Sequence, residues 1–418
     1  AMTTFPYNQE APLGGSLSPK AAMAAVIEEK TLPNGVKMIA RNGPSQFATI
    51  KFSMNAGSQN EKISEKGSAH LLSFCAFEGT QKRSGLRLLR EMENHAFVVS
   101  SGFDRQSNQF CVKAVPEFVS EAISSLAEAV FSPPKHAYVI SERKSAAAHC
   151  YKALSWNPQL NLKEMIFEAA YGEGTALGGS VFSHNLKDLK TDDVLAFRSR
   201  NFTAGNLVIA ADGVALSALE NVATGFTGAA SGPAASPYTG GCVRRRADFG
   251  GDVHVALAFP TQSGAQSGAF RVLHSMLSTR LCQRTKGSEL GSVTTAMEGG
   301  LEAVFMSASS TASAEVLLAL VVDELKNIAA DAGKASAVAK KVSLHNLVGL
   351  EGGACATDVM LAASAAGVSL KDFADVRAVS ANDVKKAAEY MLKATPAYAV
   401  VGASYGMQSY SSVCSLLK

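Results

Sequence analysis

The same order of predicted strands and helices occurs twice along the chain. Residues 48–57 and 252–261 both combine β-branched and aromatic side chains, which is typical of core strands. Residues 110–133 and 303–329 each predict a strand followed by a helix with one apolar face. A pattern that returns in both halves constrains the fold strongly, because each half must then bury a similar sheet under a similar layer of helices.

A third pair of segments follows the same order. Residues 189–213 and 379–403 each predict a helix with Ser or Thr at its N-cap and Asp-Val in its first turn, and then an apolar strand that ends near glycine. Asp193 and Asp383, in the first turns of these helices, are 190 residues apart. Alternating strands and helices imitate a repeat by chance in one pair of segments, but three pairs in one order favour a duplication.

Between the two halves lies a segment built almost entirely of Gly, Ala, Ser, Thr and Pro, residues 227–241. This composition buries little apolar surface and is typical of a linker. We therefore predict an N-terminal domain over residues 25–226 and a C-terminal domain over residues 242–418. The predicted fold class is α+β, with a mostly antiparallel sheet covered by helices in each domain.

The composition indicates a globular chain that does not bind nucleic acid. The 418 residues exceed one typical core, and 47% of them are hydrophobic and 18% charged, which argues against disorder. The formal net charge is only +3, and the longest basic run is Arg244–Arg246. We therefore expect no nucleic-acid partner, and we expect the short basic run to be a solvated edge, with contact to an acidic partner as the alternative.

The cysteines indicate the redox state of the compartment, and the lengths of the apolar runs indicate whether the chain spans a membrane. Seven cysteines are scattered singly without a CxxC pair, which favours free thiols in a reducing compartment. The longest apolar runs, such as residues 316–322, fall far short of the roughly 20 residues that span a bilayer, so no transmembrane helix is expected. Residues 1–15 lack the pattern of a signal or transit peptide, so any presequence is expected to be already removed.

A histidine lies on a predicted helix in the segment GSAHLLSFC, residues 67–75. The helix is expected to begin at about Ser68, and one of its faces carries His70, Leu71, Phe74 and Cys75. In the inverted zinc-peptidase motif His-x-x-Glu-His, two such helix histidines hold the metal and the Glu activates water. With His70 as the first histidine, this motif requires Glu at position 73 and His at position 74.

The wider sequence around this helix carries a family resemblance. The segments that carry it are, in chain order, TLPNGVKMIA, NAGSQNE, GSAHLLSF with FEGTQKRS, SERKSAAAH, FTAGNLVIAADG and LSTRLCQR. In order and spacing they resemble the pitrilysin-type family that includes the mitochondrial processing peptidase subunits and the core proteins of ubiquinol–cytochrome c reductase (respiratory complex III). The resemblance covers most of the chain and implies a two-fold α+β repeat, in agreement with the duplication above.

Departures from the family's motif predict an inactive site. The position of the general base holds Ser73, and that of the second histidine ligand holds Phe74. The family's third ligand is a Glu seven residues after a Glu-Arg pair; here the pair begins at Glu142, and the matching residue is His149. Only His70 is kept, so we expect it to be a vestigial histidine that is packed or hydrogen-bonded locally.

An altered metal site is the alternative. His70, Glu142 and His149 would supply three ligands, since Glu142 and His149 fall on one helix face. However, the Ser73 hydroxyl is a poor base without an activating partner, and Phe74 places an apolar ring where a ligand should reach. We therefore expect no catalytic residue, no bound metal and no cofactor.

The resemblance implies two non-catalytic roles, a scaffold subunit and a substrate-recognising subunit, and one stretch of the sequence distinguishes them. The resemblance implies that the substrate-binding α subunit of the processing peptidase carries a long glycine-rich loop just before its Ser-Arg-Leu element. The corresponding stretch of this chain is residues 271–284, and it contains no glycine. The missing loop implies a scaffold subunit of the second-core-protein type, and the alternative is a non-catalytic, substrate-recognising α-type subunit.

The scaffold role implies a location and a set of partners. The chain would lie peripherally on the matrix side of the mitochondrial inner membrane and support an oxidoreductase that passes electrons from ubiquinol to cytochrome c. The implied partners are a core protein 1-like subunit of the same fold, cytochrome b, cytochrome c1 and the iron-sulfur protein. An apolar stripe at Val316, Leu317, Leu320 and Val321 suits such an interface, although packing within the domain explains it equally well.

Overall fold

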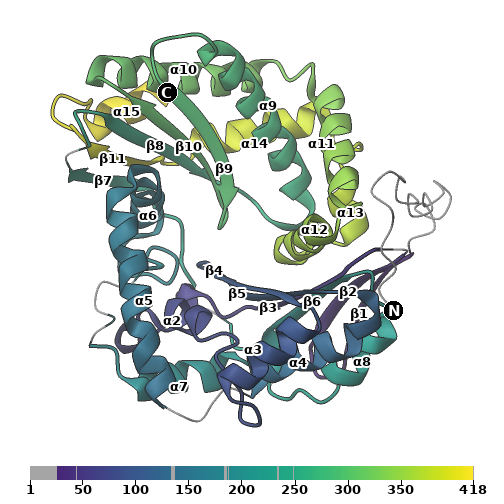
Figure 1. The fold of residues 1–418 in the computed structure, drawn as a ribbon. Helices are drawn as coiled ribbons and strands as arrows, with labels where there is room; N and C mark the ends of the chain where they lie inside the picture. The colour runs from purple at the N-terminus through teal and green to yellow at the C-terminus, as the bar shows by residue number, and fades with distance from the viewer. Residues whose placement is uncertain are drawn as a thin grey trace, which may run out of the picture.

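The computed structural model describes residues 26–43, 45–132, 137–182, 186, 188–232, 235–247 and 249–417. The N-terminal segment, for which no targeting signal is expected, lies outside these residues. Among the described residues, no helix combines the length and apolar character needed to cross a membrane. Two β-sheets dominate the structure, and each has helices packed against it (Figure 1).

The first sheet has six strands in the order β1-β2-β6-β3-β5-β4. The strands are β1 (Val26–Thr31), β2 (Lys37–Asn42), β3 (Ala48–Met54), β4 (Val98–Phe103), β5 (Asn108–Ala114) and β6 (Leu207–Asp212). All neighbours are antiparallel except β2 and β6, which run parallel. In the centre, Phe52 on β3 is paired with Phe110 on β5 and with Ile209 on β6.

The second sheet has five strands in the order β7-β11-β8-β10-β9. The strands are β7 (Gly241–Arg246), β8 (Val253–Pro260), β9 (Ser292–Glu298), β10 (Leu301–Ala308) and β11 (Ala397–Gly402). Its only parallel pair is β7 and β11. This order and these directions repeat those of β2-β6-β3-β5-β4, so the repeat expected from the sequence is present in the topology.

Helices pack on both faces of each sheet. They are α2 (Ser68–Phe74), α3 (Gly85–Asn94), α4 (Val119–Phe131), α5 (Ala137–Trp156), α6 (Pro158–Tyr171), α7 (Thr191–Asn201), α8 (Leu216–Ala223), α9 (Ser267–Thr285), α10 (Thr311–Ala330), α11 (Ala335–Gly349), α12 (Gly353–Ala366), α13 (Leu370–Ala374), α14 (Ala381–Lys393) and α15 (Tyr410–Leu417). Helices α4 and α8 pack on the first sheet, and α10 and α14 pack on the second. The predicted fold class, α+β with mostly antiparallel sheets covered by helices, is confirmed.

Two helices cross between the halves. Helix α6 belongs to the first half of the sequence but packs on β11, β8 and β7 of the second sheet, whereas α12 belongs to the second half and packs on β6 and β3 of the first. In Figure 1, α5 and α6 form a column on one side of the molecule, and α11, α12 and α13 stand on the other.

Side chains along β8 point alternately to the two faces of the second sheet, and this alternation explains how α6 packs on it. Along β8, Val255 and Leu257 point into the core under α10, and the residues between them, Ala256 and Ala258, point toward α6. Small side chains let the helix approach the sheet closely. On the helix side, Asn157 caps α6 by accepting hydrogen bonds from the backbone N–H groups of the first turn.

The structure corrects the predicted N-cap of α7 and shows where the apolar stripe of α10 packs. Ser380 caps α14 in a capping box with Asp383, as the sequence predicts. The paired helix α7 instead begins at Thr191 itself, and its N-cap position holds Lys190, which has no capping side-chain bond. In the apolar stripe of α10, Leu317 is fully buried in the core whereas Val316 is half exposed, so the stripe packs mainly within its own half.

The segment predicted as a linker is tied to the body of the protein. Thr203 donates its hydroxyl proton to the carbonyl of Ala229, and the N–H of Thr239 donates to the carbonyl of Ala170 on α6. The domain bounds 25–226, 227–241 and 242–418 stay a prediction.

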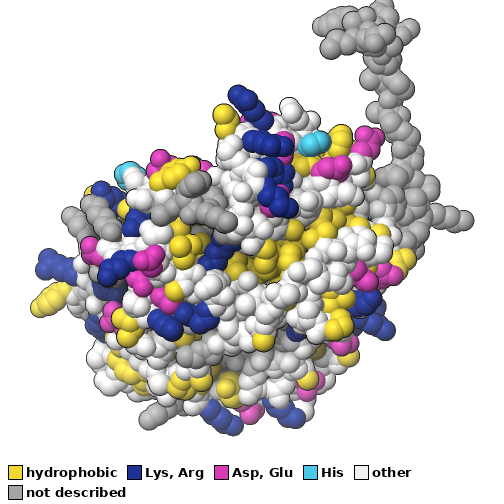
Figure 2. Space-filling model, turned by 90° about the horizontal axis from the view of Figure 1, so that it is seen from below, with side chains coloured by type: hydrophobic (Ala, Val, Ile, Leu, Met, Phe, Trp, Pro, Cys, Tyr) yellow, Lys and Arg dark blue, Asp and Glu magenta, His cyan; other side chains and the backbone are white. Residues whose placement is uncertain are grey.

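The surface carries charges of both signs. Figure 2 shows basic and acidic side chains interspersed with apolar ones on the face seen from below, as the small net charge leads one to expect. Within the basic run, Arg244 donates to the carbonyls of Met407 and Gln408, and Arg245 is ion-paired with Glu168. Two of the three arginines are therefore engaged within the chain.

Candidate functional site: the His70 helix

Helix α2 begins at Ser68, as expected, and the side-chain carboxyl group of Glu61 holds its first turn. Glu61 accepts hydrogen bonds from the backbone N–H groups of Gly67 (3.0 Å) and Ala69 (2.7 Å). Burial raises the pKa of Glu61 to about 8 and outweighs these two bonds, which favour the charged form. Gly67 itself has φ = 96°, a left-handed conformation that a side chain would strain.

His70 is enclosed by aromatic rings. Its side chain is 0% exposed. The imidazole stacks on Phe103 with ring centroids 4.4 Å apart, and Phe74 and Phe182 each meet it edge-on at 5.2 Å. We call these three phenylalanines the aromatic box. Neither ring nitrogen of His70 has a hydrogen-bond partner among the described residues. Burial lowers the pKa of His70 to about 4, so the ring is neutral at physiological pH.

The two motif positions after His70 have structural contacts. The Ser73 hydroxyl donates to the carbonyl oxygen of His70 at 2.7 Å, and the Ser73 carbonyl accepts a bond from the Ser101 hydroxyl at 2.8 Å. The hydroxyl is therefore engaged with the backbone of its own helix. Phe74 is a wall of the aromatic box.

The two candidate ligands on α5 are placed differently from His70. Helix α5 packs against α2, but Glu142 and His149 are both exposed to solvent. Between them, Arg143 forms an ion pair with Glu78. The structure therefore brings His70, Ser73 and Phe74 together in the interior and leaves Glu142 and His149 on the surface.

This arrangement does not fit a zinc ion. A catalytic zinc needs three protein ligands and an open position for water, whereas His70 faces apolar rings. Among the described residues, no group of three or more His, Cys, Asp or Glu side chains is placed to hold a metal. Ser73 could not serve as the base, because its hydroxyl is already bonded to the helix backbone.

Phe103 and Phe182 are the residues that sequence reasoning missed. Phe103 ends β4, and Phe182 follows the glycine-containing turns after α6. Neither stands near His70 in the sequence, and neither belongs to a recognisable motif, so only the three-dimensional structure brings them to the histidine.

A polar cleft of about 610 Å³ lies beside the box. Phe182 is among its described lining residues, whereas His70 is not. Its charged side chains have both signs, and Arg245 and Glu168 among them neutralise each other in an ion pair. Among the described residues, no carboxylate of this cleft forms a group with His70 that is placed to hold a metal.

Comparison with known proteins shows what the region around this helix is similar to. Residues 37–183 match the insulinase family of peptidases, M16. The matched range contains β2 to β5, the whole of α2 and α5, and all three rings of the aromatic box. The family resemblance expected from the sequence motifs is confirmed.

Three curated relatives show how far the similarity reaches. The probable mitochondrial-processing peptidase subunit alpha-1 of Arabidopsis thaliana is 30% identical over 235 residues, which are 55% of this chain and 46% of the relative. The subunit alpha of the same peptidase from Solanum tuberosum is 28% identical over 242 residues, 57% of this chain and 48% of the relative. The subunit beta from Rattus norvegicus is 25% identical over 187 residues, which are 44% of this chain and 37% of the relative. The matched part is about half the length of these relatives or less.

Proposed function

We propose that this chain is a non-catalytic subunit of a processing-peptidase-like assembly. The observation that carries the proposal is the aromatic box: His70, the one residue of the zinc motif that is kept, is buried among Phe74, Phe103 and Phe182 with both nitrogens unpartnered among the described residues. A histidine in this setting contributes packing and cannot activate water, since activation requires a metal or an acceptor beside the ring.

More specifically, we propose the scaffold role of the second core protein of respiratory complex III. Helix α9 supports this choice. It runs without interruption from Ser267 to Thr285 and so includes residues 271–284, the stretch in which the α-subunit resemblance implies a glycine-rich loop. Without that loop the chain lacks the device implied for capturing presequences.

The proposed setting follows from the same resemblance. The chain would pair with a core protein 1-like subunit of the same fold on the matrix side of the mitochondrial inner membrane, and contact cytochrome b, cytochrome c1 and the iron-sulfur protein through the assembly. Two observations are compatible with a peripheral subunit: the relatives are named as mitochondrial-processing peptidase subunits, and no described helix is able to cross a membrane.

The second candidate is a non-catalytic, substrate-recognising α-type subunit of a processing peptidase. The α subunits of Arabidopsis thaliana and Solanum tuberosum favour it, because their similarity extends over more than half of this chain. The β subunit of Rattus norvegicus covers a smaller share.

The two candidates differ in the chain that pairs with this one. The native protein should be isolated under mild detergent from its own source through a tag on this chain, and its partners identified by mass spectrometry. The scaffold role predicts cytochrome b and cytochrome c1 in amounts equal to this chain. A detergent-independent heterodimer with a subunit that carries an intact His-x-x-Glu-His motif, without cytochromes, would instead establish the α-type role.

A further inference from the structure

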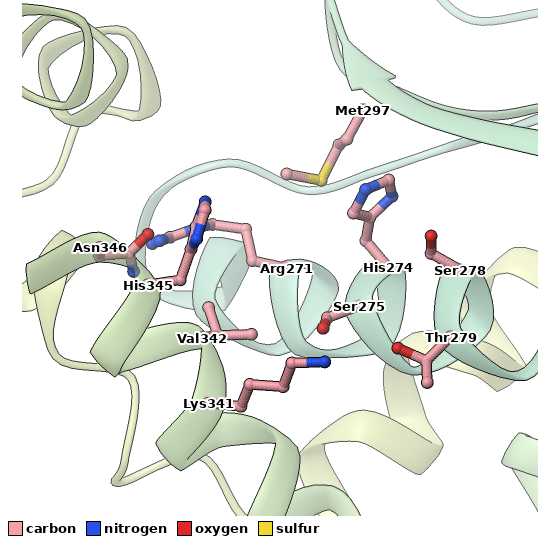
Figure 3. Close-up of a pocket in the computed structure, with 10 residues that line it drawn as sticks. All are labelled: Arg271, His274, Ser275, Ser278, Thr279, Met297, Lys341, Val342, His345 and Asn346. Atoms are coloured by element: carbon pink, nitrogen blue, oxygen red, sulfur yellow. The ribbon is translucent and has the colours of Figure 1, made fainter. Parts of the chain in front are cut away.

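A pocket of about 450 Å³ opens in the second half of the chain, outside the His70 region. It lies between α9, α11 and the edge strand β9 (Figure 3). Its lining residues are Arg271, His274, Ser275, Ser278, Thr279, Met297, Lys341, Val342, His345 and Asn346. Four of the ten side chains are basic or imidazole groups, and none is a carboxylate. We call it the α9–α11 pocket.

Arg271 is the most constrained of these groups. It is 9% exposed, its guanidinium lies over the Phe373 ring at 3.6 Å, and its Nη1 donates to the Phe373 carbonyl at 2.7 Å. Burial lowers the pKa of Arg271 to about 10, so it is still charged at neutral pH. No carboxylate among the described residues forms an ion pair with it. A buried charge is costly without a counter-charge.

A second cation enters from α11. Lys341 is exposed at the rim, and Figure 3 shows it extending toward the Ser275 and Thr279 side chains of α9. No ion pair or side-chain hydrogen bond occupies Lys341 or His345 within the described part of the chain. Arg271 and His345 both extend toward the Asn346 end of the pocket (Figure 3). Cationic and hydroxyl side chains from two helices therefore line the pocket.

A buried carboxylate beside His274 is already engaged. Glu302 on β10 accepts a hydrogen bond from Nδ1 of His274 at 2.8 Å and is 1% exposed. It lies behind the imidazole and is not a lining residue. Glu302 thus offsets His274, while Arg271 and Lys341 remain without a negative partner among the described residues.

We propose that the α9–α11 pocket binds the phosphate group of a small organic molecule. Arginine and lysine together with hydroxyl donors match the several acceptor oxygens of a phosphate, and a doubly charged ligand supplies the counter-charge that Arg271 and Lys341 lack. The volume is in the range of small-molecule sites and exceeds what a phosphate ion fills. Met297 and Val342 give the organic part an apolar wall.

Binding to the full chain should be measured by isothermal titration calorimetry with phenyl phosphate, inorganic phosphate and benzoate at moderate, constant salt. Phenyl phosphate is expected to bind saturably and more tightly than either of the others, because it alone combines the double charge with an apolar body. Lys341→Ala should weaken it about tenfold or more, the loss expected for one charge-assisted bond.

Lys340→Ala is the matched control. Lys340 is the neighbouring exposed lysine on α11, does not line the pocket, and changes the net charge equally. Its variant should bind phenyl phosphate as the unaltered chain does. Equal weakening in both variants would show attraction by overall charge, and tighter binding of benzoate or of inorganic phosphate would refute the organic-phosphate ligand. Absence of saturable binding to all three probes would also overturn the proposal.

Discussion

At the scale of single residues, the His70 side chain behaves as part of a hydrophobic core. A buried imidazole with no hydrogen-bond partner loses the hydration that it has in the unfolded chain, and its contacts with Phe103 and the two edge-on rings offset only part of that loss. The histidine is therefore a poor choice for stability at this position. That cost is consistent with descent from a site in which the ring nitrogens once had a ligand.

Replacing His70 with leucine is expected to raise the free energy of unfolding by about 1 kcal/mol at pH 7.5. The change removes two unsatisfied polar atoms, each of which costs about 1–3 kcal/mol, and gives up a stacked ring pair that contributes about 0.5–1.5 kcal/mol. Urea denaturation of His70→Leu beside the unaltered chain measures the difference.

His95→Leu is the matched control for that substitution. His95 also stacks on a phenylalanine, but its Nδ1 is hydrogen-bonded to the Glu91 carbonyl at 2.8 Å. Its replacement should destabilise the protein by about 1 kcal/mol, because a satisfied hydrogen bond is lost. A larger loss for His70→Leu than for His95→Leu would contradict the packing role of His70.

The depressed pKa of His70 predicts how stability depends on pH. The ring binds a proton at about pH 4 in the folded protein and near pH 6.5 in the unfolded chain. Protonation therefore favours the unfolded chain, and stability that is fully present above pH 6.5 is lost as the pH falls toward 4. The free energy of unfolding should fall by about 3 kcal/mol more in the unaltered chain than in His70→Leu over this range. Parallel profiles would show that His70 does not titrate in this way.

At the scale of helices and strands, the two crossing helices join the sheets into one unit. Met360 on α12 is fully buried against Val208 and Ala210 of β6, whose other face supports the core of the first half. On the opposite side, α6 buries Met165 and Ile166 against the second sheet. Each sheet thus has one face covered by a helix that the other half of the sequence supplies.

Met360→Ala tests this coupling. The substitution leaves a cavity between α12 and the first sheet and is expected to lower the free energy of unfolding by about 2–4 kcal/mol. Hydrogen exchange of the β6 amides should become faster, although β6 lies in the other half of the sequence. Leu344→Ala, at a 63% exposed position on α11, should change stability by less than about 0.5 kcal/mol. Unaltered exchange in β6 would show that α12 does not stabilise the first sheet.

The elements themselves were largely predictable, and their crossing was not. Strand and helix periodicity is local, so the paired segments around Asp193 and Asp383 could be found from sequence alone. The position of α6 depends on Ala256 and Ala258 offering a shallow face far along the chain. The start of α7 differs from its partner because Lys190 occupies the position of Ser380, and lysine offers no capping oxygen.

At the scale of the whole molecule, the two halves of the sequence build sheets of similar topology. The strand order β2-β6-β3-β5-β4, with one parallel pair, has its equal in the second sheet. Of the motif His-x-x-Glu-His, the chain has only the first residue, His70. That Ser73 and Phe74 replace the motif's Glu and His could be predicted from the sequence, because the motif states which residue types bind the metal and activate water. The burial of His70 and the exposure of Glu142 and His149 could not be predicted, since they depend on how α2 and α5 pack.

The aromatic box around His70 predicts that the chain carries no working metal site. The decisive experiment measures the zinc content of the purified protein after equilibration with zinc, together with cleavage of a mitochondrial presequence peptide, for the unaltered chain and for His70→Leu. We predict zinc well below one ion per chain, no cleavage, and no difference between the two proteins. One zinc ion per chain, with peptide cleavage that disappears in His70→Leu, would contradict this prediction.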